Sequence, residues 1–377
     1  MDENSVTLSV NGVTFSWWKS VTIVMELTNI TRQFTVAFTQ DLSGKTAKPF
    51  EGLPRTGDAV ECRIGNDTVI TGYVTGTSSS YNANGVTLTI SGASKTVDLV
   101  ECTLPMDAPH RLAGVTPAAA AASLCAPYGV RVVDHSGVTD KVTLDVTPTK
   151  KIKSALEELA KRCSILMTDN AAGDLVLTKT GAEGTAADAL RLGENVLQAR
   201  REVKSAEVFS TYTVVGQSAN AGSNLAVTAN QTKAAATVSG MRRREFVYQQ
   251  TGDVRQAAMQ RRAQLLKNHA LGASETFIYT VQGWRQSTGE LWTPNSYVRI
   301  VDEIFNTDAV MLIDQVTLIK GNDGTTAELR CIHPEALLDT DEPELEKKAS
   351  KTSNASMNFN AKGKTEQSAS KWEGKKA

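Results

Sequence analysis

The chain has 377 residues, enough for two or three domains, so no disulfide or metal is needed to stabilise its cores. Its 40 basic and 41 acidic side chains give a formal net charge of −1, which argues against a general phosphate-neutralising surface. The five cysteines contain no Cys-x-x-Cys spacing, and no apolar run reaches the ~18 residues that a membrane span needs. The acidic N-terminus is unlike a secretory signal, so we expect synthesis in a reducing cytoplasm.

The first hundred residues have the pattern of short strands. Asn11-Gly12 lies between two alternating apolar runs, the strongest local signal for a hairpin with a type I′ turn. Gly, Asn, Asp and Ser clusters separate the later runs, which predicts a small antiparallel barrel or sandwich. The expected strands lie near residues 6–10, 13–17, 21–25, 34–38, 60–64, 69–74 and 86–90.

From about residue 106 the pattern becomes helical. Thr116 and Pro117 are an N-cap and first-turn proline, and they predict an Ala-rich helix that ends at Ala126. A second helix is expected over 149–163, where apolar residues recur on one face. A hairpin with strands near 165–167 and 175–177 follows, so this part is predicted to be a small α+β domain.

The strand pattern returns at residues 208–215 and gives way to a polar stretch, 217–239, for which we expect a long mobile loop. A helix is expected over 253–271, followed by strands near 277–281, 297–301, 311–319 and 326–332. The polar residues from 337 to 377 carry too little apolar surface for a core, so we expect a flexible tail.

Two strand-rich regions resemble each other. Pairing Val60 with Val298, Val74 with Val316 and Leu88 with Leu329 gives offsets of 238, 242 and 241 residues. The nearly constant offset predicts one strand-rich module used twice, with the α+β domain between the copies.

The sequence offers no candidate catalytic, cofactor-binding or metal-binding residues. The four histidines are far apart and lack metal-ligand spacing. Asp134-His135 could be combined with Ser123 and Cys125 as base and nucleophile, but a surface loop and a helix end are simpler interpretations. We therefore expect a protein that is not an enzyme and needs no cofactor.

Basic residues cluster around the helix expected at 253–271. One interpretation is a solvated helix face; the other is a contact with an acidic neighbouring subunit. The candidate subunit-contact residues are Arg242, Arg243, Arg244, Arg261 and Arg262.

Several short motifs follow one another along the chain: Leu124-Cys125-Ala126-Pro127-Tyr128-Gly129-Val130, Leu166-Met167-Thr168, Asn170-Ala171-Ala172-Gly173, Leu192-Gly193-Glu194-Asn195-Val196-Leu197, Tyr212-Thr213-Val214 with Gly216, Gly283-Trp284 and Leu291-Trp292 with Pro294-Asn295. In these motifs and their order the chain resembles the baseplate hub proteins of Mu-type contractile-tailed bacteriophages, which belong with the late-control-protein-D-like hubs. The resemblance runs from about residue 5 to residue 335.

The resemblance implies an α+β, β-rich chain in which two tube-like antiparallel β-barrel domains flank a small α+β domain. It implies a homotrimer, a ring with pseudo-sixfold symmetry that joins a trimeric central spike to a hexameric tail tube. Such a ring would belong to the tail baseplate of a virion, contact other baseplate proteins and line the channel through which DNA passes. The expected domains are a first barrel at 1–105, a bracing domain at 106–200, a second barrel at 201–336 with an inserted loop and helix at 217–271, and the tail at 337–377.

Two alternatives stay open. The chain could be the hub portion of a type VI-like secretion spike, although only about 40 residues follow the expected second barrel, too few for a spike β-helix. It could also be a tail-associated peptidoglycan-degrading enzyme, a class for which the sequence nominates no residue.

Overall fold

The computed structural model describes residues 4–16, 18–40, 54–82, 85–217, 231–253, 256–322 and 324–337. Within these ranges the chain divides into a main unit, from Met1–Lys204 and Gly272–Asp339, and a small unit, from Ser205–Leu271. The expected tail at 337–377 lies, apart from its first residue, outside the described ranges.

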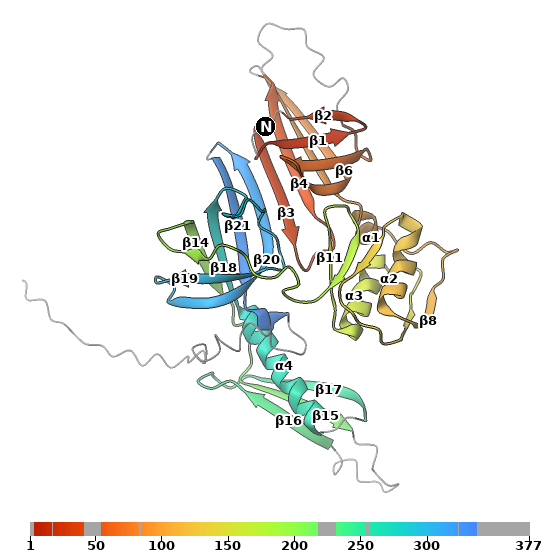
Figure 1. Cartoon of the computed structure of the whole chain (residues 1–377). Coiled ribbons are helices and arrows are strands. Elements are labelled where there is room, and N and C mark those ends of the chain that lie inside the picture. The colour runs from red at the N-terminus through yellow and green to blue at the C-terminus, as the bar shows by residue number, and fades with distance from the viewer. Residues whose placement is uncertain are drawn as a thin grey trace, which may run out of the picture. The chain divides into compact units, whose positions relative to one another are not determined.

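β-Strand is the commonest secondary structure in the described chain (Figure 1). The strands are β1 (Val6–Val10), β2 (Val13–Phe15), β3 (Ser20–Glu26), β4 (Gln33–Gln40), β5 (Ala59–Ile64), β6 (Asp67–Asn82), β7 (Gly85–Ser94), β8 (Arg111–Val115), β9 (Val132–Asp134), β10 (Val142–Asp145), β11 (Leu166–Asp169), β12 (Leu175–Thr178), β13 (Leu190–Arg191), β14 (Val196–Val203), β15 (Thr211–Gln217), β16 (Gln231–Thr237), β17 (Glu245–Asp253), β18 (Glu275–Gln282), β19 (Tyr297–Asp302), β20 (Thr307–Gly321) and β21 (Gly324–Ile332). The helices are α1 (Val97–Glu101), α2 (Pro117–Cys125), α3 (Ile152–Cys163) and α4 (Gln256–Ser274), with 3₁₀ turns at Ala126–Tyr128 and Pro334–Ala336.

The first hairpin forms as its sequence predicts. Asn11 and Gly12 both have positive φ, 48° and 81°, which is the backbone of a type I′ turn. Val10 pairs with Val13 across this turn, and β1 then pairs along its length with β5. Alternate residues of β1 are buried, so the period-two pattern correctly identifies the core face.

The duplication predicted from the sequence is present in the strand topology. Within the main sheet, the order β5-β6-β7-β4-β3 in the first part matches the order β19-β20-β21-β18-β14 in the second. Every one of these pairings is antiparallel in both parts. We call these two groups of strands the first module and the second module.

The ladder registers give the residue correspondence between the modules. Both long hairpins fit one offset of 239 residues, since Gly76 pairs with Ser91 as Gln315 pairs with Arg330, and Tyr81 pairs with Val86 as Lys320 pairs with Thr325. Val60 pairs with Gly72 as Val298 pairs with Met311, so the predicted match of Val60 with Val298 is confirmed.

The other two matches predicted from the sequence are wrong by two or three residues. Val74 corresponds to Ile313, not Val316, and Leu88 corresponds to Ala327, not Leu329. The match of Leu88 with Leu329 is shifted by two residues, which keeps the same face because strands have a period of two. The match of Val74 with Val316 is shifted by three residues and crosses the β20 bulge, whose extra residue brings Val316 onto the face of Ile313. Only the ladder partners fix the register.

The two modules also share an irregularity. The register shifts between Val74 and Gly76 in β6 and between Ile313 and Gln315 in β20, which is a β-bulge at equivalent positions. In front of each bulge the equivalent hydrogen bond forms. In the first module Gly57 N–H donates to the Val74 carbonyl, and in the second Asn295 N–H donates to the Ile313 carbonyl, each at 2.8 Å. Gly57 and Asn295 both have positive φ, 93° and 68°.

The two modules join edge to edge inside the chain, and this corrects the expectation of two separate barrels. The first half of β20 pairs with β19, and its second half pairs with β3 of the first module, from Gln315–Glu26 to Lys320–Val21. The result is one 13-stranded sheet, and the described strands do not close it into a barrel within one chain. β20 is 15 residues long and so serves both partners, and its bulge lies between the two pairings.

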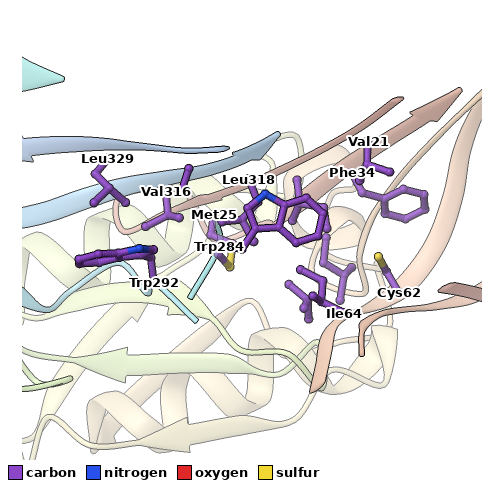
Figure 2. Packing of buried hydrophobic residues seen from close by; sticks show 14 of the residues in the cluster. Val21, Met25, Phe34, Cys62, Ile64, Trp284, Trp292, Val316, Leu318 and Leu329 are labelled. Carbon is purple, nitrogen blue, oxygen red and sulfur yellow. The ribbon is translucent and has the colours of Figure 1, made fainter. Parts of the chain in front are cut away.

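One hydrophobic core lies beneath this joint (Figure 2). Trp284 is fully buried between residues of β3 and β20 and Ile64 of β5, and its indole Nε1–H donates to the carbonyls of Ile319 and Thr326 at 3.1 and 3.0 Å. The joint residues Met25 and Val316 are 2% and 0% exposed. Because the core is continuous across the modules, they are held together by side-chain packing as well as by the strand ladder.

The predicted α+β domain forms between the modules. Its elements run from α1 to β12, and we call it the middle domain. Thr116 Oγ1 accepts the Ala119 N–H at 3.3 Å and caps α2, and the apolar face of α3 packs on α2. The predicted hairpin is β11–β12, which β9 extends as a parallel third strand. The boundary expected at residue 200 is wrong in one respect: it falls inside β14, which pairs along its length with β18 of the second module.

The small unit differs from the sequence prediction. Residues 208–215 were expected to be a strand of a second barrel, but β15 belongs to a separate three-stranded sheet, β16-β15-β17. The predicted loop at 217–239 is wrong for Gln231–Thr237, which forms β16, while residues 218–230 lie outside the described ranges. Within this unit Val214 packs with Met259 and Ala263 of α4, so three strands and a helix form a small core.

Candidate functional site

The main sheet has one apolar face and one polar face. Along β3, β18 and β21, core residues alternate with half-buried residues on the opposite face. Ladder partners on that opposite face form a row across six strands, and the row consists of Ser91, Thr35, Thr22, Ile319, Thr326 and Gln282. Thr35 and Ser91 hydroxyls lie 3.3 Å apart in this row. Hydroxyl groups therefore dominate a continuous face that both modules share.

Charges on the polar face are paired with one another at the joint between the modules. Arg330 of β21 donates from Nε to Asp314 at 2.8 Å and from Nη2 to Glu26 of β3 at 2.8 Å. Burial raises the pKa of Asp314 above its ordinary value, and the Arg330 guanidinium only partly offsets this effect. The ion pairs of Arg330 with Asp314 and Glu26 hold β3 against β20 and β21, and they leave little unpaired charge at this point of the polar face.

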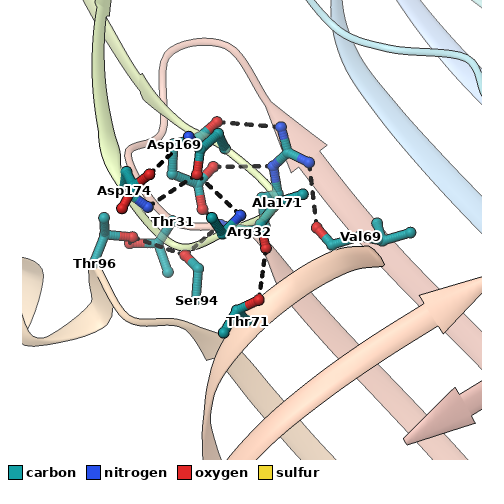
Figure 3. A network of polar contacts seen from close by, with 11 residues as sticks. Thr31, Arg32, Val69, Thr71, Ser94, Thr96, Asp169, Ala171 and Asp174 are labelled. Carbon is teal, nitrogen blue, oxygen red and sulfur yellow. Dashed lines mark hydrogen bonds and ion pairs between the residues drawn. The ribbon is translucent and has the colours of Figure 1, made fainter. Parts of the chain in front are cut away.

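A buried ion pair attaches the middle domain to the first module (Figure 3). Arg32 follows β3, and Asp169 ends β11; Arg32 donates to the carboxylate from its backbone N–H at 2.9 Å and from Nε at 3.2 Å. Asp169 is 2% exposed. Burial raises the pKa of Asp169, while Arg32 and Ser94 act in the opposite direction. Figure 3 also shows the Thr71 hydroxyl donating to the Ala171 carbonyl at 2.9 Å.

A second attachment links the middle domain to the second module. Asn295, at the turn before β19, donates from its amide to the Lys179 carbonyl at 2.9 Å and accepts the Gly181 N–H at 2.7 Å. Gly181 has φ of 74°, and a Cβ there would lie 2.0 Å from the Tyr297 ring. The middle domain is therefore bonded to the first module between β3 and β4 and to the second module at the turn before β19.

The arginines proposed as subunit contacts differ in their surroundings within the small unit. Arg242 and Arg261 are exposed, and Arg243 pairs with Glu245 at 2.8 Å. Arg244 lies over the Phe209 ring, 5.0 Å from its centroid, and bonds the carbonyls of Ser205 and Ala206.

Arg262 differs from its neighbour Arg261 in burial. It is half-buried, and its guanidinium lies over the Tyr248 ring at 5.3 Å. Arg244 and Arg262 thus contribute to the packing of the small unit, and the role of all five arginines in subunit contact stays a prediction.

The residues considered for catalysis do not converge. The Asp134 carboxylate accepts hydrogen bonds from the backbone and hydroxyl of Ser136, at 2.8 and 2.6 Å, while the Ser123 hydroxyl donates to the Ala119 carbonyl. Burial raises the pKa of Cys125 to about 12, so this thiol is a poor nucleophile.

The described ranges hold neither a cluster of metal-binding side chains nor a helix that could cross a membrane. Among those residues no group of three or more His, Cys, Asp or Glu could hold a metal ion. No helix there is both long and apolar enough to span a bilayer.

Sequence reasoning missed the residues that attach the domains to one another. Arg32 and Asp169 are 137 positions apart, and neither stands in a recognisable motif. Asn295 does lie in the Pro294-Asn295 stretch of the family resemblance, but that motif predicts no contacts for its amide.

Three family models match consecutive parts of the chain. Residues 5–94 match the model of the Mu phage baseplate assembly protein GpP-like N-terminal domain. Residues 96–179 match the second domain of baseplate hub protein gp44-like proteins, and residues 255–340 match the fourth domain of Mu phage baseplate assembly protein GpP. These matches cover the first module, the middle domain and most of the second module.

Whole-chain comparisons agree with the family models. The chain is 31% identical over 332 residues to baseplate hub protein gp44 of Escherichia phage Mu, covering 84% of each protein. It superposes on the 43 kDa tail protein of prophage MuSo2 from Shewanella oneidensis with a TM-score of 0.78, at 28% identity over 88% of this chain and 99% of that one. The fold also resembles the E. coli type VI secretion component c3393, with a TM-score of 0.51 at 11% identity, over 86% of this chain and 76% of that one.

Proposed function

Because the chain belongs to the family of the baseplate hub protein gp44 of Escherichia phage Mu, we propose that it forms a homotrimeric ring in the baseplate of a contractile tail. The ring joins the central spike to the tail tube and contacts other baseplate proteins. It is a component of the virion, made in the cytoplasm of the host bacterium, and it works through its surfaces without catalysis or a cofactor.

One observation carries the proposal: each chain holds two copies of the same five-stranded module, joined through β3 and β20. Three chains with two modules each provide six similar units around one axis. A ring of this kind presents threefold symmetry to a trimeric partner and approximate sixfold symmetry to a hexameric one. Closure of the open sheet into a tube-like barrel is then a property of the trimer.

The polar face of the sheet supplies the lining of the channel. Its threonine and serine hydroxyls are neutral, and the Arg330 guanidinium is held by Asp314 and Glu26. DNA is bound strongly where cationic side chains neutralise its phosphates, and this face offers few unpaired cations. Such a lining lets DNA pass without retaining it.

The middle domain braces the ring from outside the sheet, and the small unit contacts neighbouring baseplate proteins. The ion pair of Arg32 with Asp169 and the bonds of Asn295 support the bracing role. Exposure of Arg242 and Arg261 supports the contact role. Replacing Arg242 and Arg261 by glutamate should leave the trimer intact and reduce baseplate assembly in a complementation assay; unchanged assembly would refute the contact role.

Light scattering on the purified full chain, alone and co-expressed with the spike protein of the same tail, tests the ring. The expected mass of the hub is three times the 40.4 kDa chain. A monomer under both conditions would overturn the proposal. Hydrolysis of peptidoglycan by the purified chain would instead support the enzyme alternative.

A further inference from the structure

Among the described strands of the two modules, two edges have no strand partner in the single chain. The second half of β6, from Gly76 to Tyr81, pairs with β7 on one side, and no described strand pairs with its other side. β14 pairs with β18 on one side, and its opposite edge likewise has no strand partner within the described ranges. Exposed strand edges readily pair with another chain.

The residue correspondence between the modules identifies what each edge fits. Gly76–Tyr81 corresponds to the part of β20 that pairs with β3, since Gly76 matches Gln315 and Tyr81 matches Lys320. β14 corresponds to β3. Gly92 and Cys331 are equivalent residues, and their ladder partners are Phe34 and Phe277. Phe34 in turn pairs with Ile23 of β3 and Phe277 with Arg201 of β14, so Ile23 corresponds to Arg201. The open edge of β6 is therefore equivalent to β20, and the open edge of β14 to β3, and β20 and β3 already pair with each other inside the chain.

We propose that the open edge of β6 in one copy pairs antiparallel with the open edge of β14 in a second copy, in the register of the internal joint. The internal joint pairs Val316 with Met25, Leu318 with Ile23 and Lys320 with Val21. Replacing each residue by its equivalent in the other module predicts the intermolecular pairs Thr77–Val203, Ser79–Arg201 and Tyr81–Ala199. The inference rests on the proposed ring and specifies which strands close it. Because the two edges differ, the contact is head-to-tail and closes only as a ring.

The directions of backbone hydrogen bonds agree with this assignment. Leu27 N–H donates to the Asp314 carbonyl, so by alternation Met25, Ile23 and Val21 direct their backbone groups toward β20. Lys204 N–H donates to the Ser274 carbonyl on the β18 side, so alternation leaves the groups of Val203, Arg201 and Ala199 on the open edge. These three residues are the equivalents of the three that bond in the internal joint.

Exposed apolar side chains gather on the same two edges. Tyr81 is 82% exposed, and on β14 Leu197 and Val203 are 59% and 56% exposed. In the internal joint the equivalent residue of Val203 is Met25, which is 2% exposed. Pairing with a second copy would remove this apolar surface from water.

Cysteine cross-linking of the full chain tests the register. Ser78 and Glu202 face each other in the proposed joint as a pair without backbone hydrogen bonds between them, a geometry in which side chains come closest. Under oxidation the Ser78→Cys, Glu202→Cys variant should form covalent dimers and trimers. The matched control is Ser78→Cys, Gln198→Cys, whose second cysteine lies on the same face but roughly 13 Å further along the strand, beyond disulfide reach.

Proline substitution gives an independent test. Ser79 corresponds to Leu318, so its N–H points to the open edge; Ser79→Pro removes that donor without removing a bond to β7. We expect a folded chain by circular dichroism with the mass of a monomer, whereas Ser79→Val should keep the assembly of the wild type.

The outcomes separate this inference from the proposed ring. A trimer by light scattering that fails to cross-link through Ser78→Cys and Glu202→Cys, or that forms equally with Ser79→Pro, overturns the strand pairing and leaves the ring standing. Equal cross-linking in the Gln198→Cys control overturns the register. A wild-type chain that is monomeric with and without the spike overturns both.

Discussion

Val74 of β6 and Ile313 of β20 occupy the same position in two copies of one five-stranded module. Each is buried, each precedes a β-bulge, and each bonds through its backbone to a turn residue with positive φ, Gly57 or Asn295. The side chains around the two sites differ almost completely, so the equivalence lies in the backbone. A repeated backbone is what a ring of similar units requires, because neighbouring units then meet at similar edges.

Removing Arg32 from its ion pair should destabilise the main unit strongly. Arg32→Met leaves the Asp169 carboxylate buried without its cation, which typically costs about 3–5 kcal/mol. Chemical denaturation measures the free energy of unfolding. The control is Arg131→Met: Arg131 pairs with Asp174 at 2.6 Å but is 73% exposed, so the expected cost is about 0–1 kcal/mol. Equal costs for the two variants would contradict the structural role assigned to the Arg32 pair.

Alanine substitutions at Gly181 and Gly184 distinguish the cost of a steric collision from the cost of backbone strain. Both have positive φ, 74° and 78°, but only at Gly181 would a Cβ meet the Tyr297 ring, whereas the Cβ at Gly184 meets nothing within 4 Å. Gly184→Ala should cost about 1–2 kcal/mol from strain alone. Gly181→Ala should cost more, because the collision displaces Tyr297 at the attachment of the second module. Thermal unfolding of both variants checks this order, and an equal loss would show that the Tyr297 contact is unimportant.

The second module should lose stability in acid through Glu275. Burial acts to raise the pKa of Glu275, but His333 and Arg201 outweigh it and hold this pKa below its ordinary value of about 4.5. The ionised carboxylate is therefore favoured in the folded state. Its stabilising effect is fully present above about pH 4.5 and is lost as the pH falls through the lower, folded-state pKa.

Denaturation of wild type and Glu275→Gln between pH 7 and pH 3 measures this effect. The difference in free energy of unfolding between them should shrink as the pH falls through that window. Asp308→Asn serves as the control, because Asp308 pairs with Arg299 on the surface and solvent screens that pair. A Glu275→Gln difference that stays constant with pH would contradict the ion pair.

Trp284 should be the most sensitive core position at the joint. Trp284→Phe keeps an aromatic ring but removes the donor that serves the Ile319 and Thr326 carbonyls. The lost hydrogen bond contributes about 0.5–1.5 kcal/mol, and the smaller ring leaves a cavity besides. Trp292→Phe, in the same core, is the comparison. A smaller loss of unfolding free energy at position 284 than at 292 would contradict the assignment.

Much of the fold follows from local pattern in the sequence. Asn11-Gly12 predicts its hairpin and Thr116-Pro117 its helix start, because turn and cap geometry depend on the residues themselves. The duplication was also visible, since Val60 and Val298 lie in matching alternating strands. The exact register was not visible, because apolar residues recur every second position and a match shifted along the strand puts apolar residues opposite each other just as well.

The parts that sequence reasoning missed depend on distant partners. Gln231–Thr237 is polar and Ala-rich and has little intrinsic preference for a strand, yet it forms β16 because β15 offers an edge and Met259 covers Ala-rich positions. β14 was divided by a domain boundary because its exposed side chains lack an apolar alternation. In the proposed ring a second copy pairs with that strand, so its pattern reflects an interface instead of a core.

Electron cryo-microscopy of the purified hub complex, viewed along its axis, decides whether six modules surround one channel. We predict six similar lobes around an open channel, with each chain contributing two neighbouring lobes. Three lobes, with the second module of each chain lying outside the ring, or particles without a central opening, would contradict it.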